Sequence, residues 1–444
     1  MEEQYPRPDF RRDALEWQCL NGEWDFRFDD NDIGLSQRWH KRGIHSDCED
    51  ESTKRTIQVL FVFQSKAPGV DDQTAHEVLW YEWDFCDIRT ETHKRNGYGL
   101  MVRFGAVDYI AKVFIDGTFV GEHCGGHVPF ELDITDTLGL ETCPERIYRL
   151  TVRVFDSAYG LKQPRGKQYW GPKPKTIYYT PSSGIWQSVW LESVPSLRIA
   201  DSSHGTILRS NDIEGGELIT GKQCSVVLEA SLCGVVVHTS ERKQRPHDHD
   251  FVQFDHSMRV PKERVPQLPS EFLRHTPLLD PACWRDRLAI WSPEHPVLYD
   301  LTIELYDADD NLIDQVNTTT GMRSINWTKG DGSFRLNGKP YFQALVLDQG
   351  YWPETLMTPP DSHALKRDIE LSKAMGFNGC RRHQKVEDPL FMYWADKLGF
   401  LCWSEMASAF DFSVDMMERF DQEWMEAVRR DINHPCVVAW TPAN

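Results

Sequence analysis

The sequence predicts a mainly β chain of several domains that ends in alternating strands and helices. Apolar and polar side chains alternate along residues 148–154, a period of two that is typical of a half-buried strand. Between residues 112 and 122 the pair Asp116-Gly117 separates two apolar runs, which is a strong hairpin signal. From about residue 334, short apolar runs alternate with helical patterns. We therefore expect two β-sandwiches followed by βα units, and 444 residues suffice for two to four domains.

The first sandwich is expected over residues 1–195 and the second over residues 196–322. Large apolar side chains are predicted in the core of the first sandwich, among them Trp24, Phe104 and Trp190. Strands of the second sandwich are predicted at residues 226–232, 234–238 and 301–305. The proline-rich residues 261–281 predict a long irregular connection.

One polar stretch of the second block, residues 241–250, carries two imidazoles and two carboxylates at residues 247–250. These side-chain types can bind a metal ion, but their spacing matches no compact ligand set. A solvated loop is the better interpretation, and we expect no cofactor and no metal in the chain.

Four short apolar runs in the last part of the chain predict strands at residues 341–347, 377–383, 401–406 and 437–440. Asp361 and Asp388 are expected to cap the first two helices, and Gly376 and Gly399 to end them. A third helix is predicted from an apolar residue at every fourth position, at Phe420, Trp424 and Val428. The resulting order β-α-β-α-β-α-β predicts that residues 323–444 form the first half of a (β/α)8 TIM barrel, strands one to four.

Composition excludes several classes of function. With 49 Lys and Arg against 68 Asp and Glu, the net charge is −19, which argues against nucleic acid binding. No apolar run is long enough to span a membrane, and no secretory signal opens the chain. The 11 scattered cysteines form no CxxC pair, which favours reduced thiols and a cytoplasmic protein. Aromatic residues make up 12% of the chain, and carbohydrate sites often use such rings, although most of them are expected in the cores.

Several stretches follow one another in a recognisable order: LNGEWDF at 20–26, RFGAVDY at 103–109, TPSSGIWQSVWLE at 180–192, FRLNGKP at 334–340, GFNGCRRH at 376–383 and RDINHPCVVAW at 430–440. Together they resemble glycoside hydrolase family 2, the β-galactosidase/β-glucuronidase group. The resemblance implies that residues 1–195 are a sugar-binding jelly roll and that residues 196–322 are an immunoglobulin-like sandwich, which exits at Gly321-Met322-Arg323. Residues 323–444 would then begin the catalytic barrel.

The resemblance also implies a retaining glycosidase of carbohydrate metabolism that hydrolyses O-glycosyl bonds of β-galactosides or β-glucuronides. Such enzymes use two carboxyl groups about 5–5.5 Å apart, one as acid/base and one as nucleophile. In the family the acid/base glutamate follows an asparagine at the end of strand four, which Asn444 matches, and the nucleophile ends strand seven. Both would lie beyond residue 444, so this chain is expected to be inactive as given. Glu405 is not expected to replace the acid.

Six substrate-binding residues are implied at the carboxyl ends of the barrel strands: Asn444, His383, Arg382, Asp348, Trp352 and Glu405. Asn444 would contact the sugar 2-hydroxyl. From the sequence alone, His383 is equally a core histidine and Arg382 a salt-bridged barrel residue. Residues 347–353 replace the family's usual histidine-containing first loop, which leaves the roles of that loop open.

Two functions remain open at this point. The first is a family 2 glycosidase whose catalytic half is not within these residues, and the second is a non-catalytic carbohydrate-binding or scaffold protein. The expected partner is a carbohydrate in both, with neither nucleic acid nor membrane. A half barrel exposes residues 341–347 and 437–440 as apolar edge strands, so self-association through these edges is also expected.

Overall fold

The hairpin and the period-two strand predicted from the sequence lie side by side in one antiparallel sheet. The computed structural model describes residues 5–12, 16–48, 54–67, 69–138, 146–200, 208–212, 217–221, 225–243, 253–268, 284–307, 309–327, 330 and 332–444. The sheet has the order β4-β3-β5-β11-β8-β9, formed by Arg55–Val59, Gly22–Phe28, Val78–Cys86, Ile147–Phe155, Ile110–Ile115 and Thr118–Cys124. Asp116 and Gly117 join β8 to β9 with positive φ angles of 47° and 77°, as a type I′ turn requires.

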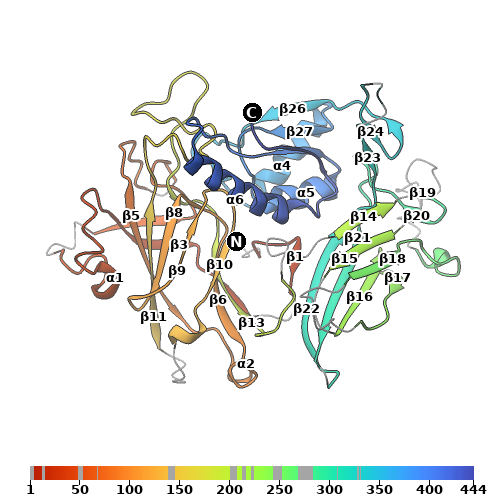
Figure 1. Ribbon diagram of the computed structural model, residues 1–444, viewed down its shortest axis with the longest axis horizontal. Helices are drawn as coiled ribbons and strands as arrows, with labels where there is room; N and C mark the ends of the chain where they lie inside the picture. The colour runs from red at the N-terminus through yellow and green to blue at the C-terminus, as the bar shows by residue number, and fades with distance from the viewer. Residues whose placement is uncertain are drawn as a thin grey trace.

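A second sheet packs against the first and completes the sandwich at the left of Figure 1. Its order is β10-β6-β13-β2, formed by Phe130–Asp133, Gly99–Phe104, Val189–Val194 and Trp17–Cys19. The strand pair β7 (Val107–Asp108) and β12 (Gly184–Ile185), the helices α1 (Trp39–Arg42) and α2 (Glu91–Arg95) and the 3-10 turn η2 (Thr135–Leu138) lie outside these sheets. The predicted core residues Trp24, Phe104 and Trp190 are all buried.

The period-two strand β11 is not half-buried as expected, because its polar side chains are covered as well. Thr151 is fully buried, and the guanidinium of Arg153 pairs with Asp32 at 2.6 Å. Arg149 lies 3.4 Å from the carboxylate of Glu82 on the neighbouring strand. The alternation identified the strand correctly, but ion pairs with residues distant in the sequence cover its polar face.

The second sandwich, at the right of Figure 1, combines a five-stranded and a three-stranded antiparallel sheet. The first has the order β1-β22-β21-β16-β17, formed by Phe10–Arg11, Leu312–Thr320, Tyr299–Tyr306, Ser225–Leu232 and Val235–Thr239. The second has the order β14-β15-β18, formed by Leu208–Asp212, Glu217–Gly221 and Gln253–Ser257. The hairpin β19-β20 (Trp284–Arg285, Leu288–Ala289) and the 3-10 turn η4 (Val265–Gln267) also belong to this block. The polar residues 247–250 lie outside the described residues, as do residues 269–281 of the proline-rich connection.

The strand β1 crosses from the start of the chain into the second sandwich. Phe10 pairs with Thr318 and is buried in the core of that sandwich. Arg12 extends the contact through an ion pair of 3.1 Å with the buried Asp314. The amino-terminal segment therefore ties the two sandwiches together, which the residue pattern did not indicate.

A four-stranded parallel sheet forms the last part of the chain and lies between the two sandwiches in Figure 1. It follows the small sheet β23-β24-β25 (Ile325–Asn326, Arg335–Leu336, Lys339–Pro340). Its order is β26-β27-β28-β29, formed by Leu345–Asp348, Gly379–Arg382, Leu401–Glu405 and Val437–Thr441. The connecting helices are α4 (Ala364–Ala374), α5 (Pro389–Leu398) and α6 (Val414–Asp431). All four strands and three helices predicted for this part are present.

The helix ends follow the predicted capping chemistry with one difference. The Asp388 side chain accepts a hydrogen bond from Leu390 N, and Gly399 ends α5 in the left-handed conformation. The helix α4 instead begins after His363, and the Asp361 carboxylate accepts from the His363 amide in the turn before it. Asp361 therefore belongs to the turn that leads into the helix rather than to its cap.

Among the described residues, β26 and β29 are the edge strands of the parallel sheet, as expected. One face packs its buried side chains, such as Cys380 and Cys402, into the apolar core beneath the helices. The opposite face is open, because Leu347 is 55% exposed and its register neighbours Arg381 and Trp403 are only half-buried. The unit thus has one packed face and one accessible face.

The helix α6 packs against the first sandwich through a buried carboxylate. Glu423 is fully buried and accepts a hydrogen bond of 2.7 Å from the His127 amide. Burial raises the pKa of Glu423 well above its usual value, and the nearby Asp108 carboxylate adds to the effect. Burial therefore favours the protonated form of Glu423, although the hydrogen bond from the His127 amide favours the carboxylate.

Within the described residues, no helix is long and apolar enough to cross a membrane. In the same part of the chain, no group of three or more His, Cys, Asp or Glu side chains is arranged to hold a metal ion. The described cysteines are all free thiols.

The open face of the parallel sheet leads to a prediction about local stability. Apolar side chains that lack a covering layer each forgo roughly 1.5–3 kcal/mol of burial, so β26 and β29 should exchange their amide hydrogens faster than β5 and β11. Hydrogen exchange on the 444-residue chain at a concentration where it is monomeric would measure this. Equal protection of the two sets of strands would contradict the prediction.

A second prediction concerns Glu423. Because its pKa is raised in the folded chain, folding loses stability as the pH rises from about 4.3, the usual glutamate value. The substitution Glu423→Gln keeps the acceptor for the His127 amide and removes the titration. The variant should therefore gain stability over the wild type between pH 5 and 8, by about 1.4 kcal/mol for each unit of pKa difference. Urea unfolding at several pH values measures this, with the exposed Glu418→Gln as the matched control.

Candidate functional site

Three residues meet at the carboxyl ends of the central strands of the parallel sheet. Arg381, on β27, donates a hydrogen bond to Glu405 at the end of β28. The same guanidinium donates at 2.8 Å to the Asn444 side-chain oxygen. Glu405 is fully buried, whereas Asn444 is exposed. Arg381 thus links the floor of this site, Glu405, to its rim, Asn444. We name these three residues the strand-end cluster.

The turn after β27 closes around Glu405. The second carboxylate oxygen of Glu405 accepts a hydrogen bond of 2.9 Å from the Gln384 amide, and it lies 3.1 Å from Nδ1 of His383. Burial lowers the pKa of His383 below its usual value, although the Glu405 carboxylate opposes the effect. The imidazole is therefore more readily neutral than an exposed one, and it can exchange hydrogen bonds with a hydroxyl-rich ligand.

Arg382, the next residue along β27, lies beneath the site and not in it. It is 1% exposed, pairs with the Asp348 carboxylate and lies 3.2 Å from Glu387. Its guanidinium also stacks over the Phe391 ring at 3.8 Å. Burial lowers the pKa of Arg382, but the carboxylates of Asp348 and Glu387 outweigh it and raise that pKa. These contacts engage the Arg382 guanidinium with two carboxylates, and a role for Arg382 in lining the pocket stays a prediction.

Asp348 and Lys385 complete this buried ion network. The Asp348 carboxylate accepts from the Gly350 amide at 2.8 Å, and Lys385 donates to the Gly350 carbonyl at 2.7 Å. Lys385 also pairs with Glu387 at 3.0 Å. A side chain at Gly350 would meet the Glu387 carboxylate at 2.5 Å, and its φ of +66° also favours glycine. The network fixes the first two loops against each other.

Trp352, the remaining predicted residue, is half-buried against the apolar core under the sheet. Its backbone pairs with Leu356 in a tight loop. No interaction described for these residues joins Trp352 to Glu405. The structure therefore brings together Glu405, His383 and Asn444 of the six predicted residues. It places Arg382 and Asp348 in the ion network and Trp352 at its margin.

A long segment of the first sandwich, residues 156–183, reaches the same edge of the sheet. The Gly166 amide donates at 2.9 Å to the Ser408 carbonyl, just past β28. A side chain at Gly166 would meet the Gln384 carbonyl oxygen at 2.1 Å. Lys167 follows directly and is 4% exposed. No local pattern of residues predicts this contact, because the two segments are more than 200 residues apart.

The strand-end cluster can bind a polar ligand but lacks a free catalytic carboxylate pair. Both Glu405 oxygens are engaged, one by Arg381 and the other by the Gln384 amide. Retaining glycoside hydrolysis needs two carboxyl groups about 5–5.5 Å apart on either side of the bond. The sequence pattern did not identify Arg381, whose register with Leu347 and Trp403 places it on the open face of the sheet.

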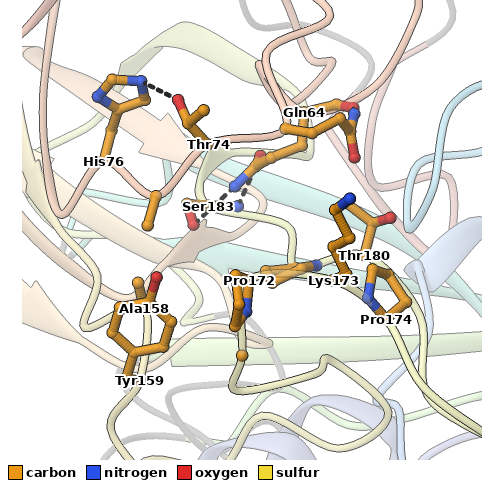
Figure 2. A pocket seen from close by; sticks show the side chains of 14 residues that line it. Gln64, Thr74, His76, Ala158, Tyr159, Pro172, Lys173, Pro174, Thr180 and Ser183 are labelled. Atoms are coloured by element: carbon orange, nitrogen blue, oxygen red, sulfur yellow. Dashed lines mark hydrogen bonds between the residues drawn. The ribbon is translucent and has the colours of Figure 1, made fainter.

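A separate hollow of about 580 Å³ lies on the first sandwich beside residues 156–183. Figure 2 shows Gln64 turned toward Ser183 on one side, with the rings of Tyr159 and Pro172 on the other. Gln64 Nε2 donates a hydrogen bond of 3.0 Å to Ser183 Oγ. Nearby, Thr74 Oγ1 lies 2.8 Å from His76 Nε2. None of the six predicted site residues lines this hollow, so it is distinct from the strand-end cluster.

The buried ion pairs of Arg382 with Asp348 and Glu387 lead to a prediction about stability. The substitution Arg382→Met leaves Asp348 without its cation and Glu387 with Lys385 alone, and should cost about 3–5 kcal/mol of unfolding free energy. Chemical denaturation measures the loss. The control is Arg367→Met, because Arg367 makes an exposed ion pair with Asp361 that is worth at most about 1 kcal/mol. Equal effects of the two substitutions would contradict a structural role for Arg382.

The chain is similar to curated proteins named β-galactosidase and β-glucuronidase. It is 26% identical over 376 residues to a β-galactosidase of Thermoanaerobacter pseudethanolicus, covering 82% of this chain and 44% of the relative. It is 24% identical over 486 residues to the β-glucuronidase of Felis catus, covering 99% of this chain and 65% of that protein. The chain thus spans about half to two thirds of the length of these curated relatives.

The fold is shared with solved structures. The β-glucuronidase from Ruminococcus gnavus in complex with D-glucuronic acid superposes with a TM-score of 0.73 at 19% identity, covering 99% of this chain and 68% of that one. A family model described as "Glycosyl hydrolases family 2, sugar binding domain" matches residues 17–195, and one described as "Glycosyl hydrolases family 2" matches residues 268–323. Two models of one family, matched in separate parts of the chain, show that the chain belongs to glycosyl hydrolases family 2.

Proposed function

We propose that this chain binds β-glycosides at the strand-end cluster and supplies the substrate-binding part of a retaining β-glycosidase. The reaction would be hydrolysis of O-glycosyl bonds in β-galactosides or β-glucuronides. The observation that carries the proposal is the junction of Arg381, Glu405 and Asn444 at the carboxyl ends of parallel strands. Ligand sites of βα folds lie at this end of the sheet. The relatives named as β-galactosidases and β-glucuronidases support the substrate class.

The proposed role of Glu405 is to position Arg381. Its side chain is fully buried and both its oxygens accept hydrogen bonds, so it has no free face toward an anomeric carbon. The resemblance instead puts the acid/base glutamate directly after Asn444 and the nucleophile on a later strand. We therefore propose that neither catalytic carboxylate is among residues 1–444.

The four parallel strands are proposed to be the first half of a (β/α)8 barrel. Three features support this: the strand order β26-β27-β28-β29, the helices α4, α5 and α6 on one face, and the accessible side chains on the other. In such a barrel the open face would become the inside. As edge strands, β26 and β29 would also be the surfaces through which the isolated chain self-associates.

Hydrolysis by the 444-residue chain tests the assignment of Glu405. We expect no cleavage of 4-nitrophenyl β-galactoside or β-glucuronide above the rate of the buffer. The reason is that both Glu405 oxygens are engaged, so the leaving group finds no positioned acid. Release of 4-nitrophenol measures the rate. Cleavage that disappears in Glu405→Gln would show that Glu405 is a catalytic acid after all.

Sugar binding tests the proposed function directly. The wild-type chain should bind methyl β-galactoside or methyl β-glucuronide, and Asn444→Ala should weaken that binding about threefold to tenfold, the value of one hydrogen bond. Calorimetry or ligand-observed NMR gives the dissociation constants. Because Asn444 is exposed, the substitution should leave the fold intact, and the exposed Asn96→Ala serves as the control. Failure of the wild type to bind either sugar would refute the function, whereas unchanged binding in the variant would refute only the role of Asn444.

A further inference from the structure

Residues 156–183 of the first sandwich are held firmly against the carboxyl edge of the parallel sheet. The amides of Phe410 and Asp411 both donate at 2.9 Å to the Leu161 carbonyl. Gly166 donates to Ser408 from the other side, as described above. The rings of Trp170 and Phe410 pack 4.4 Å apart. The segment is therefore fixed in place beside the strand-end cluster.

Lys167 is a largely buried lysine whose ammonium forms no ion pair with the described residues. The residue is 4% exposed, and its ammonium lies 5.3 Å from the centre of the Tyr178 ring. Its main chain is engaged, since its carbonyl accepts from the Tyr179 amide at 2.8 Å. Buried ammonium groups are normally paired with an acceptor, because an unpaired charge is costly to remove from water. This position therefore lacks the anion that such a group usually has.

The charge of Lys167 acts on the site. Burial lowers the pKa of Lys167 and the Glu405 carboxylate opposes that effect, while Lys167 in turn helps to lower the pKa of His383. Glu405 cannot serve as the missing partner, because Arg381 and the Gln384 amide already engage its two oxygens. Arg381 and Lys167 together outweigh the single negative charge of Glu405, so the site carries an excess of positive charge.

The surrounding segment is basic in an acidic protein. Residues 157–183 contain no Asp or Glu, and their cations are Lys162, Arg165, Lys167, Lys173 and Lys175, in a chain of net charge −19. Lys162 pairs with Asp415 at 3.0 Å, and Arg165 donates to the carbonyl of Ala158 at 3.2 Å. Lys173 and Lys175 are exposed. Lys167 is thus the cation of this segment that is both buried and without an acceptor among the described residues.

We infer that Lys167 is a substrate-binding residue, delivered to the site by the first sandwich, that recognises the carboxylate of a uronic acid. The inference rests on the proposed function and deepens it, because it favours β-glucuronides over β-galactosides. A carboxylate would supply the missing acceptor and balance the excess positive charge. The neutral hydroxymethyl group of a glucoside or galactoside offers a hydrogen bond but no charge.

A pair of sugars that differ only at carbon six tests this inference on the full chain. Methyl β-D-glucuronide carries a carboxylate where methyl β-D-glucoside carries a hydroxymethyl group. The wild type should bind the glucuronide about tenfold or more tightly, as expected for one charge-assisted hydrogen bond. Lys167→Met should abolish that preference by weakening glucuronide binding alone, and Lys167→Arg should keep most of it. The exposed Lys173→Met on the same segment is the matched control and should change neither affinity.

The possible outcomes distinguish failure of the inference about Lys167 from failure of the proposed function. If the wild type binds both sugars equally, or if Lys167→Met weakens both to the same extent, Lys167 does not read the carboxylate and the inference is wrong. A preference that survives in Lys167→Met also overturns it. Thermal melting confirms that each variant is folded, and the comparison of the two sugars on the wild type needs no variant at all. If the wild type binds methyl β-D-galactoside but not methyl β-D-glucuronide, the inference alone is wrong. If it binds neither of these two sugars, the proposed function falls, and the inference falls with it.

Discussion

The close approach of the Gly166 backbone to the turn after β27 is the contact on which the site depends. The carboxyl ends of the parallel strands form one edge of the sheet. Here residues 156–183 of the first sandwich lie against that edge. A Cβ atom at Gly166 would lie 2.1 Å from the Gln384 carbonyl, so a larger residue would push the segment away. The same approach places Lys167 where its charge acts on Glu405 and His383. The site is therefore made by two units of the chain and neither provides it alone.

Strand geometry explains why the two adjacent arginines have different roles. Successive side chains on a strand point to opposite faces, so Arg381 and Arg382 cannot share one environment. Arg381 faces the accessible side and joins Glu405 to Asn444. Arg382 faces the loops beneath, where Asp348 and Glu387 neutralise it. The ion network gives the rigid support that the strand-end cluster needs, because it fixes the loops on either side of the first two strands.

Features that depend on neighbouring residues could be predicted from the sequence, whereas contacts between distant residues could not. The Asp116-Gly117 turn and the Asp388 cap depend on neighbouring residues alone, and both are found as predicted. The sequence interpretation named Arg382 and not Arg381, because the face that a residue of a short strand occupies depends on the register with neighbouring strands. The register of Arg381 with Leu347 and Trp403 involves three strands, so it cannot be read from the sequence of one strand. Contacts such as β1 with β22 or Gly166 with Ser408 join residues far apart in the sequence, where no local pattern records them.

The division of roles in this site has a consequence for specificity. The proposed recognition groups lie on the sandwich segment and on the ends of β27 and β29, with Glu405 held in hydrogen bonds between them. Transition-state chemistry in a retaining glycosidase resides in two other carboxylates. A substitution at Lys167 would thus change which sugar is preferred and leave the acid/base chemistry untouched, because that residue contacts neither reacting oxygen in the proposed arrangement. The sandwich segment is then the part of the chain where substrate preference can change at the least cost to catalysis.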